Sequence, residues 1–172
     1  LWVYRNGRIN AQGTVEERIT FQGDRLEALY QDLPGQWDRI WINEGDAGLD
    51  NVFTNVVIRN SLIGIQCEPV PWLPDLPTSA NKLVLDNVRI ENASAAGILS
   101  RNYRIESTNL LVADCGQYCI ALTGGGQYAF NHTTAANYWA WDVRNTPAFI
   151  LTNRFTDVNG TVRTAAIEPS TF

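Results

Sequence analysis

The chain carries a repeat of about 22 residues, and a repeat this short restricts the fold to stacked copies of one small unit. Each copy ends an alternating apolar segment with a polar anchor, as in Leu-Val-Leu-Asp-Asn87 and Ile-Glu-Ser-Thr-Asn109. One copy cannot bury its own apolar residues, so neighbouring copies must stack. Successive anchors are 27, 22, 23 and 21 residues apart. The anchors are Asn60, Asn87, Asn109, His132 and Asn153.

Apolar residues alternate on both sides of each anchor, which predicts two short strands that meet at a corner. Around the second anchor these residues are Leu83 and Leu85 before it and Ile90 after it. A third strand in each coil is indicated by the dipeptides Gly-Ile65, Gly-Ile98 and Cys-Ile120. The pattern predicts an all-β fold, a right-handed single-stranded parallel β-helix with three short strands per coil.

Stacking is expected to bring the five anchors into one ladder at the same corner of every coil. A side-chain amide at this corner can bond the turn backbone of the neighbouring coil, which an apolar residue cannot do. His132 is the only histidine in the chain. We therefore expect His132 to replace an asparagine in this structural ladder, in preference to acting as a catalytic base.

The repeat predicts one β-helix domain over residues 1–172, as a fragment of a longer protein. Residues 7–14 and 19–23 alternate apolar residues around glycines and are expected to form the first coils. Residues 24–38 and 68–80 break the period, and the second segment contains four prolines, which cannot donate to a ladder. Both segments are predicted to be loops that project from the stack.

The charge of the chain excludes some classes of partner. The net charge is −5, and Lys82 is the only lysine beside twelve arginines. A general nucleic-acid binder needs a basic surface, so no nucleic acid is expected as a partner. No stretch of 18 apolar residues occurs, so no transmembrane segment is expected. Arginine in preference to lysine suits bidentate contacts with acidic sugars, although scattered structural ion pairs explain it more simply.

Three cysteines, Cys67, Cys115 and Cys119, allow at most one disulfide within the chain. Cys115 and Cys119 are close enough in sequence for a bridge across a turn, and two small buried side chains are an equal alternative. A zinc site is not expected, because such sites draw on several cysteines and histidines.

Three segments of the chain resemble a known family. They are Ile19-Thr-Phe-Gln-Gly-Asp-Arg-Leu-Glu27, Pro-Gly-Gln-Trp-Asp-Arg-Ile-Trp41, and the Ala-Asn-Tyr-Trp139 that follows Gly124-Gly-Gly126. The family is that of bacterial extracellular right-handed parallel β-helix repeat proteins, also described as pectate-lyase-like. The resemblance implies the same fold and a secreted or outer-surface location, often within a larger polypeptide. It carries over no catalytic residue.

Enzymes on this fold need acidic groups on adjacent rungs, either to bind calcium or to serve as acid and base. Aligned on the anchors, the outward positions form two columns, and neither column holds two carboxylates. The columns are Arg59, Asp86, Thr108, Asn131 and Thr152, and Val57, Val84, Glu106, Ala129 and Ile150. No catalytic residue is therefore assigned, and any chemistry would lie in the loops or on further coils.

Acidic residues concentrate in residues 24–50, which hold seven of the eighteen carboxylates. Asp46 and Asp50 are the candidates for calcium ligands, because they stand at short spacing among glycines. The segment lacks the alternating aspartates and closing glutamate of a calcium loop. An ordinary solvated turn is the simpler interpretation, and no other cofactor is expected.

Trp37 and Trp72 lie in the two loops and are the candidates for carbohydrate binding, because exposed flat rings stack against sugar faces. The alternative is that they fold back over the coils as apolar cover. We expect a non-catalytic extracellular or cell-surface module for glycan binding, adhesion or surface architecture. Its partners would be a polysaccharide or other surface glycan, or a larger surface assembly including the rest of its own polypeptide. A polysaccharide lyase or glycoside hydrolase, and a purely structural solenoid segment, remain as alternatives.

Overall fold

The computed structural model describes residues 1–4, 7–44, 48–69, 78–156 and 159–172, and these residues form strands and turns with no helix. Ten strands form one sheet whose pairings are all parallel, while β11 and β12 form a separate antiparallel pair. The strands are β1 (Trp2–Val3), β2 (Asn10–Gln12), β3 (Ile19–Phe21), β4 (Ile40–Asn43), β5 (Asn51–Arg59), β6 (Ile63–Glu68), β7 (Lys82–Glu91), β8 (Ala96–Ala113), β9 (Tyr118–Ala136), β10 (Phe149–Thr152), β11 (Arg154–Thr156) and β12 (Val162–Thr164).

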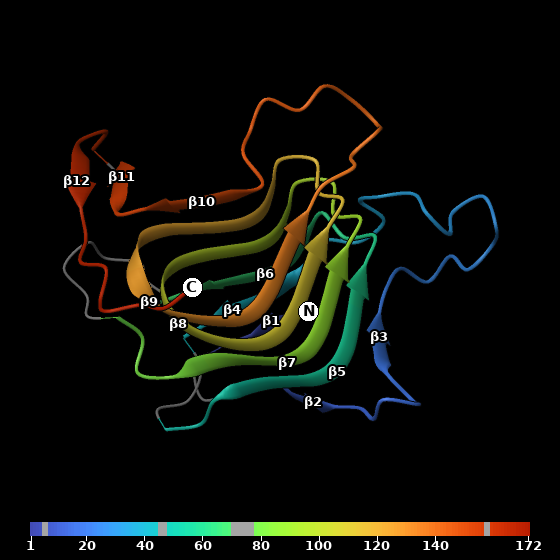
Figure 1. Ribbon diagram of the computed structural model, residues 1–172, viewed down its shortest axis with the longest axis horizontal. Helices are drawn as coiled ribbons and strands as arrows, with labels where there is room; N and C mark the ends of the chain where they lie inside the picture. The colour runs from blue at the N-terminus through green and yellow to red at the C-terminus, as the bar shows by residue number, and fades with distance from the viewer. Residues whose placement is uncertain (5–6, 45–47, 70–77, 157–158) are drawn as a thin grey trace.

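The parallel pairings fall into three rows, and Figure 1 shows the strands of successive coils lying side by side. The first row contains β1, β4, β6, the beginnings of β8 and β9, and β10. The second row contains β2, the first half of β5, and the equivalent parts of β7, β8 and β9. The third row contains β3 and the last parts of the same four strands. The expected all-β fold is therefore present in the described residues, and its parallel strands fall into three rows.

Within a row, equivalent apolar residues of successive strands stack into a continuous buried column, which explains the period-two pattern. Ile40, Ile65, Ile98 and Ile120 pair successively in the first row, and each is fully buried. This confirms the third strand that the Gly-Ile65, Gly-Ile98 and Cys-Ile120 dipeptides predicted. Alternation places one face of each strand in the core and the other outside.

The corner between the second and third rows is a single residue with a positive φ, between 52° and 54° in the four successive coils. Asparagine tolerates this left-handed conformation better than other non-glycine residues. The side-chain amide of Asn109 donates to Oδ1 of Asn87 at 2.9 Å, and that of Asn87 donates to Oδ1 of Asn55 at 2.6 Å. His132 has the same backbone conformation at the next coil. The ladder at this corner is Asn55, Asn87, Asn109 and His132.

Two of the five predicted ladder members are wrong. Asn60 lies at the next corner, where Asn92 donates to its Oδ1 at 2.8 Å. Asn153 follows β10, whose Thr152 pairs with Thr123 in the first row, so it does not lie above His132. The error at Asn60 arose because each coil has two polar corners five residues apart. The sequence alignment matched Asn60, at the second corner of its coil, with Asn87, at the first corner of the next coil.

The predicted first coils and the predicted loop of residues 24–38 can be compared with the structure. Ala11 of β2 is buried, and Ile19 and Phe21 of β3 pack against the core. Residues 24–38 contain turns and no strand, as expected. Glu68, predicted to begin the second loop, is instead the last residue of β6, and residues 70–77 of that predicted loop lie outside the described part of the chain.

Candidate functional site

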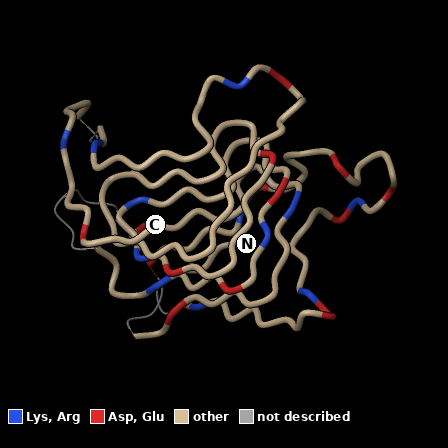
Figure 2. The backbone as a smooth tube through the Cα atoms, viewed as in Figure 1, with Lys and Arg blue, Asp and Glu red and all other residues tan. Residues whose placement is uncertain are grey.

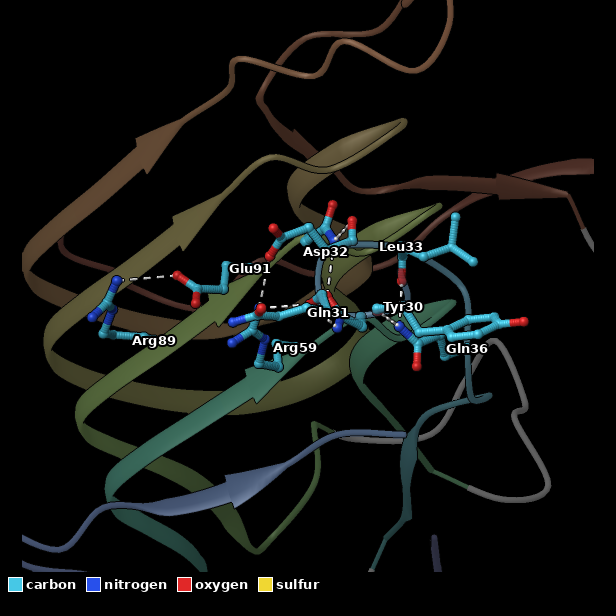
Figure 3. A network of polar contacts seen from close by, with 10 residues as sticks. Tyr30, Gln31, Asp32, Leu33, Gln36, Arg59, Arg89 and Glu91 are labelled. Carbon is cyan, nitrogen blue, oxygen red and sulfur yellow. Dashed lines mark hydrogen bonds and ion pairs between the residues drawn. The ribbon is translucent and has the colours of Figure 1, made fainter. Parts of the chain in front are cut away.

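The loop of residues 24–38 is held against the second polar corner by three side-chain donors. Figure 3 shows one of them, Arg59, beside Gln31 and Asp32 of the loop. Asn60 Nδ2 and Arg59 Nη2 both donate to the carbonyl oxygen of Gln31, each at 2.8 Å. Asn92 Nδ2 donates to the carbonyl oxygen of Asp32 at 2.7 Å. The corner asparagines therefore form hydrogen bonds with the neighbouring coil and with the loop at the same time.

A polar cavity of about 240 Å³ lies between this loop and the coils. Gln36 closes one side, because its backbone amide donates to the Asn60 carbonyl at 2.8 Å and its side chain donates to the Tyr30 and Leu33 carbonyls. Gly23 leaves room for this glutamine, since a Cβ there would lie 2.8 Å from Gln36 Oε1. The lining residues are Gln22, Gly23, Arg25, Leu26, Gln31, Gln36, Arg59 and Asn60.

Among the described residues, the lining carries two guanidinium groups and no carboxylate. Arg59 is paired with Asp32 outside the lining, at 3.0 Å, and its buried Nε has no hydrogen-bond partner among the described residues. Arg25 stacks on the face of Tyr30, 4.6 Å from the ring centroid. In Figure 2 the loop carries both acidic and basic residues. The cavity therefore offers amide and guanidinium donors to a polar or anionic group.

Trp37, predicted to bind carbohydrate, is half-buried and does not present a fully exposed ring for sugar stacking. Its indole packs against the core, and its Nε1 donates to the Arg59 carbonyl at 2.8 Å. The ring covers the coils, which was the alternative that the sequence left open. Trp72, the other predicted contact, lies outside the described residues.

The structure describes one of the two acidic calcium candidates, Asp50. Asp46 lies outside the described residues, and Asp50 accepts a hydrogen bond from the backbone amide of Lys82 at 2.9 Å. Residues 1–4, 7–44, 48–69, 78–156 and 159–172 contain no group of three or more possible metal ligands. Asp50 therefore has a structural contact at the start of β7.

A pair of carboxylates on the outer face of the second row was missed by the comparison of columns. Asp86 pairs in register with Thr108, and Glu106 pairs with Val84, so the two acids are diagonal neighbours on β7 and β8. Both line one shallow depression of about 180 Å³. Lys82 contacts both oxygens of Glu106 at 2.9 and 3.0 Å. Comparing diagonal positions as well as columns would have found this pair.

The outer face of the first row carries a second cluster that the sequence did not reveal. Trp2 pairs in register with Trp41, and their rings meet edge to face with centroids 5.1 Å apart. The buried carboxylate of Glu68 accepts hydrogen bonds from Trp41 Nε1 at 2.9 Å, Gln66 Nε2 at 2.7 Å and Arg101 Nη1 at 3.0 Å. These contacts satisfy the carboxylate, which gives Glu68 a structural role.

Replacing Asn92 by glycine, which adopts the positive φ of 58° at this position without strain, is expected to loosen the loop of residues 24–38 while leaving the coils folded. The change removes the amide that holds the Asp32 carbonyl and its bond to Asn60. Amide hydrogen exchange should become at least several-fold faster in residues 24–38 and stay unchanged in β7 and β8. Equal acceleration in β8 would show that Asn92 stabilises the stack and not the loop in particular.

No protein-family model, no curated protein and no solved structure matches the chain. The described residues contain no helical segment with the length and hydropathy needed to span a bilayer.

Proposed function

We propose that the chain is a non-catalytic extracellular or cell-surface module, built as a right-handed parallel β-helix, that binds a glycan in the pocket beneath the loop of residues 24–38. The fold proposal is supported by the parallel pairing of successive coils in three rows. Parallel crossover connections are right-handed in nearly all proteins. The extracellular location rests on the resemblance of three sequence segments to secreted β-helix repeat proteins.

The observation that carries the binding proposal is the lining of the pocket, in which the described residues supply amides and two guanidinium groups without a carboxylate. Sugar hydroxyls both donate and accept hydrogen bonds, so side-chain amides match them, and guanidinium adds charge-assisted bonds to acidic substituents. The volume of about 240 Å³ is below that of pockets for drug-sized ligands, so it suits one sugar unit of a longer chain.

Replacing Arg25 by alanine is expected to weaken glycan binding by about tenfold or more, because one charge-assisted hydrogen bond contributes on the order of 1.5–3 kcal/mol. Arg25 is exposed and stacks on the Tyr30 ring at the surface, so the fold should persist. The measurement is calorimetric titration with soluble dextran, alginate and polygalacturonate, with thermal unfolding as a check.

The matched control is Arg8→Ala, which removes another exposed arginine outside the lining. The pocket is supported if the wild type binds a polysaccharide, Arg25→Ala weakens this binding and Arg8→Ala leaves it unchanged. Equal binding by both variants, or no binding of any polysaccharide by the wild type, would remove the proposal.

A carbohydrate-active enzyme is the second candidate, favoured by the diagonal carboxylates Asp86 and Glu106 in one depression. Two carboxylates at a suitable separation can act as acid and base on a glycosidic bond. The same polysaccharides should then release reducing ends or unsaturated products, and Asp86→Asn should abolish the release. Such turnover would contradict the proposal that the chain is a non-catalytic module.

A further inference from the structure

The rung that follows β9 is filled in two of its three rows. In the first row β10 pairs with the beginning of β9. In the second row Ile167 and Thr171 form parallel bridges to the middle of β9. In the third row no strand of the described residues pairs with the side of residues 133–136 that faces away from β8. One strand position is therefore open at this end of the stack, and we call it the third-row slot.

The backbone of β9 faces this slot with groups that a further strand would bond. On the opposite side of the same strand, the Ala136 carbonyl accepts a hydrogen bond from the Asp114 amide at 3.2 Å. Successive residues of a parallel ladder direct their amide and carbonyl groups to alternate neighbours. The amides and carbonyls of Thr133 and Ala135 therefore face the slot. An unpaired row of this kind is a template for another strand.

An apolar column of the third row ends in the slot. Its members pair in register from one rung to the next, in the order Phe21, Ile58, Ile90, Val112 and Ala135. Ile58, Ile90 and Val112 are fully buried, whereas Ala135, the last member, is only half-buried. The small side chain of Ala135 leaves room for a larger apolar residue on the next rung.

The open end of this column is an apolar pocket of about 480 Å³. Phe172 forms one wall, because its ring stacks on Phe130 with the centroids 5.8 Å apart and meets Phe149 edge to face at 5.7 Å. The lining residues are Phe130, His132, Thr133, Ala135, Phe149 and Phe172. The pocket therefore suits an apolar side chain, and the backbone beside it suits an extended chain.

We propose that the third-row slot binds an extended peptide segment of a partner protein. The segment adds to β9 as a parallel strand and places two apolar side chains, two residues apart, above Thr133 and Ala135. Main-chain hydrogen bonds supply affinity in such strand addition, and the pocket selects the side chains.

Two observations favour a single strand as the occupant. The third-row ladder is continuous from β3 to β9, so an added strand extends an existing interface. A second copy of the chain cannot stack a whole coil on this end, because β10 and residues 167–171 already fill the other two rows. The slot has room for one strand only.

The probe is a peptide copied from the third row itself, Asn-Val-Arg-Ile-Glu-Asn of residues 87–92, labelled at its C-terminus with a fluorophore. In β7 its apolar side chains, Val88 and Ile90, are buried, and Arg89 is exposed. Titration with the wild-type protein, followed by fluorescence anisotropy, should saturate. The control peptide Asn-Val-Ile-Arg-Glu-Asn has the same composition without the alternation and should bind about tenfold more weakly or less.

Ala135→Trp fills the pocket from the last member of the column and should weaken peptide binding by about tenfold or more. The matched control is Thr134→Trp, which adds the same side chain at the neighbouring, exposed position and should leave binding unchanged. Circular dichroism checks that both variants fold. Equal binding by the wild type and Ala135→Trp would overturn the proposal, as would equal binding of the two peptides or no saturable binding.

Residue-resolved amide exchange, measured by nuclear magnetic resonance, reports strand addition directly. The bound peptide should slow exchange at Thr133 and Ala135, whereas the amides of Thr134 and Ala136 face β8 and should not change. Protection without this alternation would overturn the proposal. Self-association of the wild type that Ala135→Trp abolishes would assign the slot to a second copy and would overturn it as well.

Discussion

Replacing Ile98 by alanine is expected to destabilise the fold by about 2–5 kcal/mol, the usual cost of truncating a fully buried isoleucine. Ile98 lies in the middle of a buried column, with Ile65 on one rung and Ile120 on the other. The cavity would open between two coils, and neither coil can collapse into it without breaking parallel pairs on both sides. Urea unfolding followed by circular dichroism measures the change.

Leu99→Ala is the matched control, because Leu99 is the next residue of the same strand and is only half-buried. It loses a side chain of the same size from the outer face, where the expected cost is less than about 1 kcal/mol. Equal costs for the two variants would contradict the assignment of an inner and an outer face in the first row.

Replacing Asn87 by alanine is expected to destabilise the protein by about 2–4 kcal/mol, through hydrogen bonds and backbone strain together. The Asn87 side chain bonds Asn55, Asn109 and the guanidinium of Arg18, and its φ is 54°. Alanine cannot make these bonds and adopts this φ only with strain. Glycine also loses the bonds but adopts the conformation freely.

Asn87→Gly should therefore be more stable than Asn87→Ala by about 1–2 kcal/mol, which separates backbone strain from the loss of the amide. Thermal unfolding of both variants gives the comparison. The control is Asn131→Ala, an exposed position of β9 next to the ladder, where about 0.5 kcal/mol or less is expected. Alanine and glycine variants of equal stability would show that the positive φ carries no strain.

The strands and their stacking were predictable because burial fixes the period of two. Leu83, Ile105 and Tyr128 pair in register, as the alignment had placed them. The slip at Asn60 shows where that reasoning fails. Asn55 and Asn60 both follow alternating segments, and an apolar pattern fits the next coil from either of them. Only the pairing of Val56 with Val88 identifies Asn55 as the ladder member.

The pocket was not predictable, because it depends on where a loop docks and not on a repeating pattern. Arg59 was assigned to the same outward column as Asp86, whereas it pairs with Asp32 of the loop. Trp37 was predicted to be exposed because it lies in a loop that breaks the repeat, but docking of the loop places its ring against the core. Contacts between a loop and the stack leave no periodic signal in the sequence.

The three corners of the coil differ in their tolerance of additional chain. In the four successive coils the corner between the second and third rows is always one residue, Asn55, Asn87, Asn109 or His132. The other connections vary in length, as residues 24–38 and 137–148 show between the third row and the first. A foreign peptide grafted into either of these segments should leave the register of the coils intact. The same peptide inserted after Asn87 would separate two hydrogen-bonded amides and divide the stack.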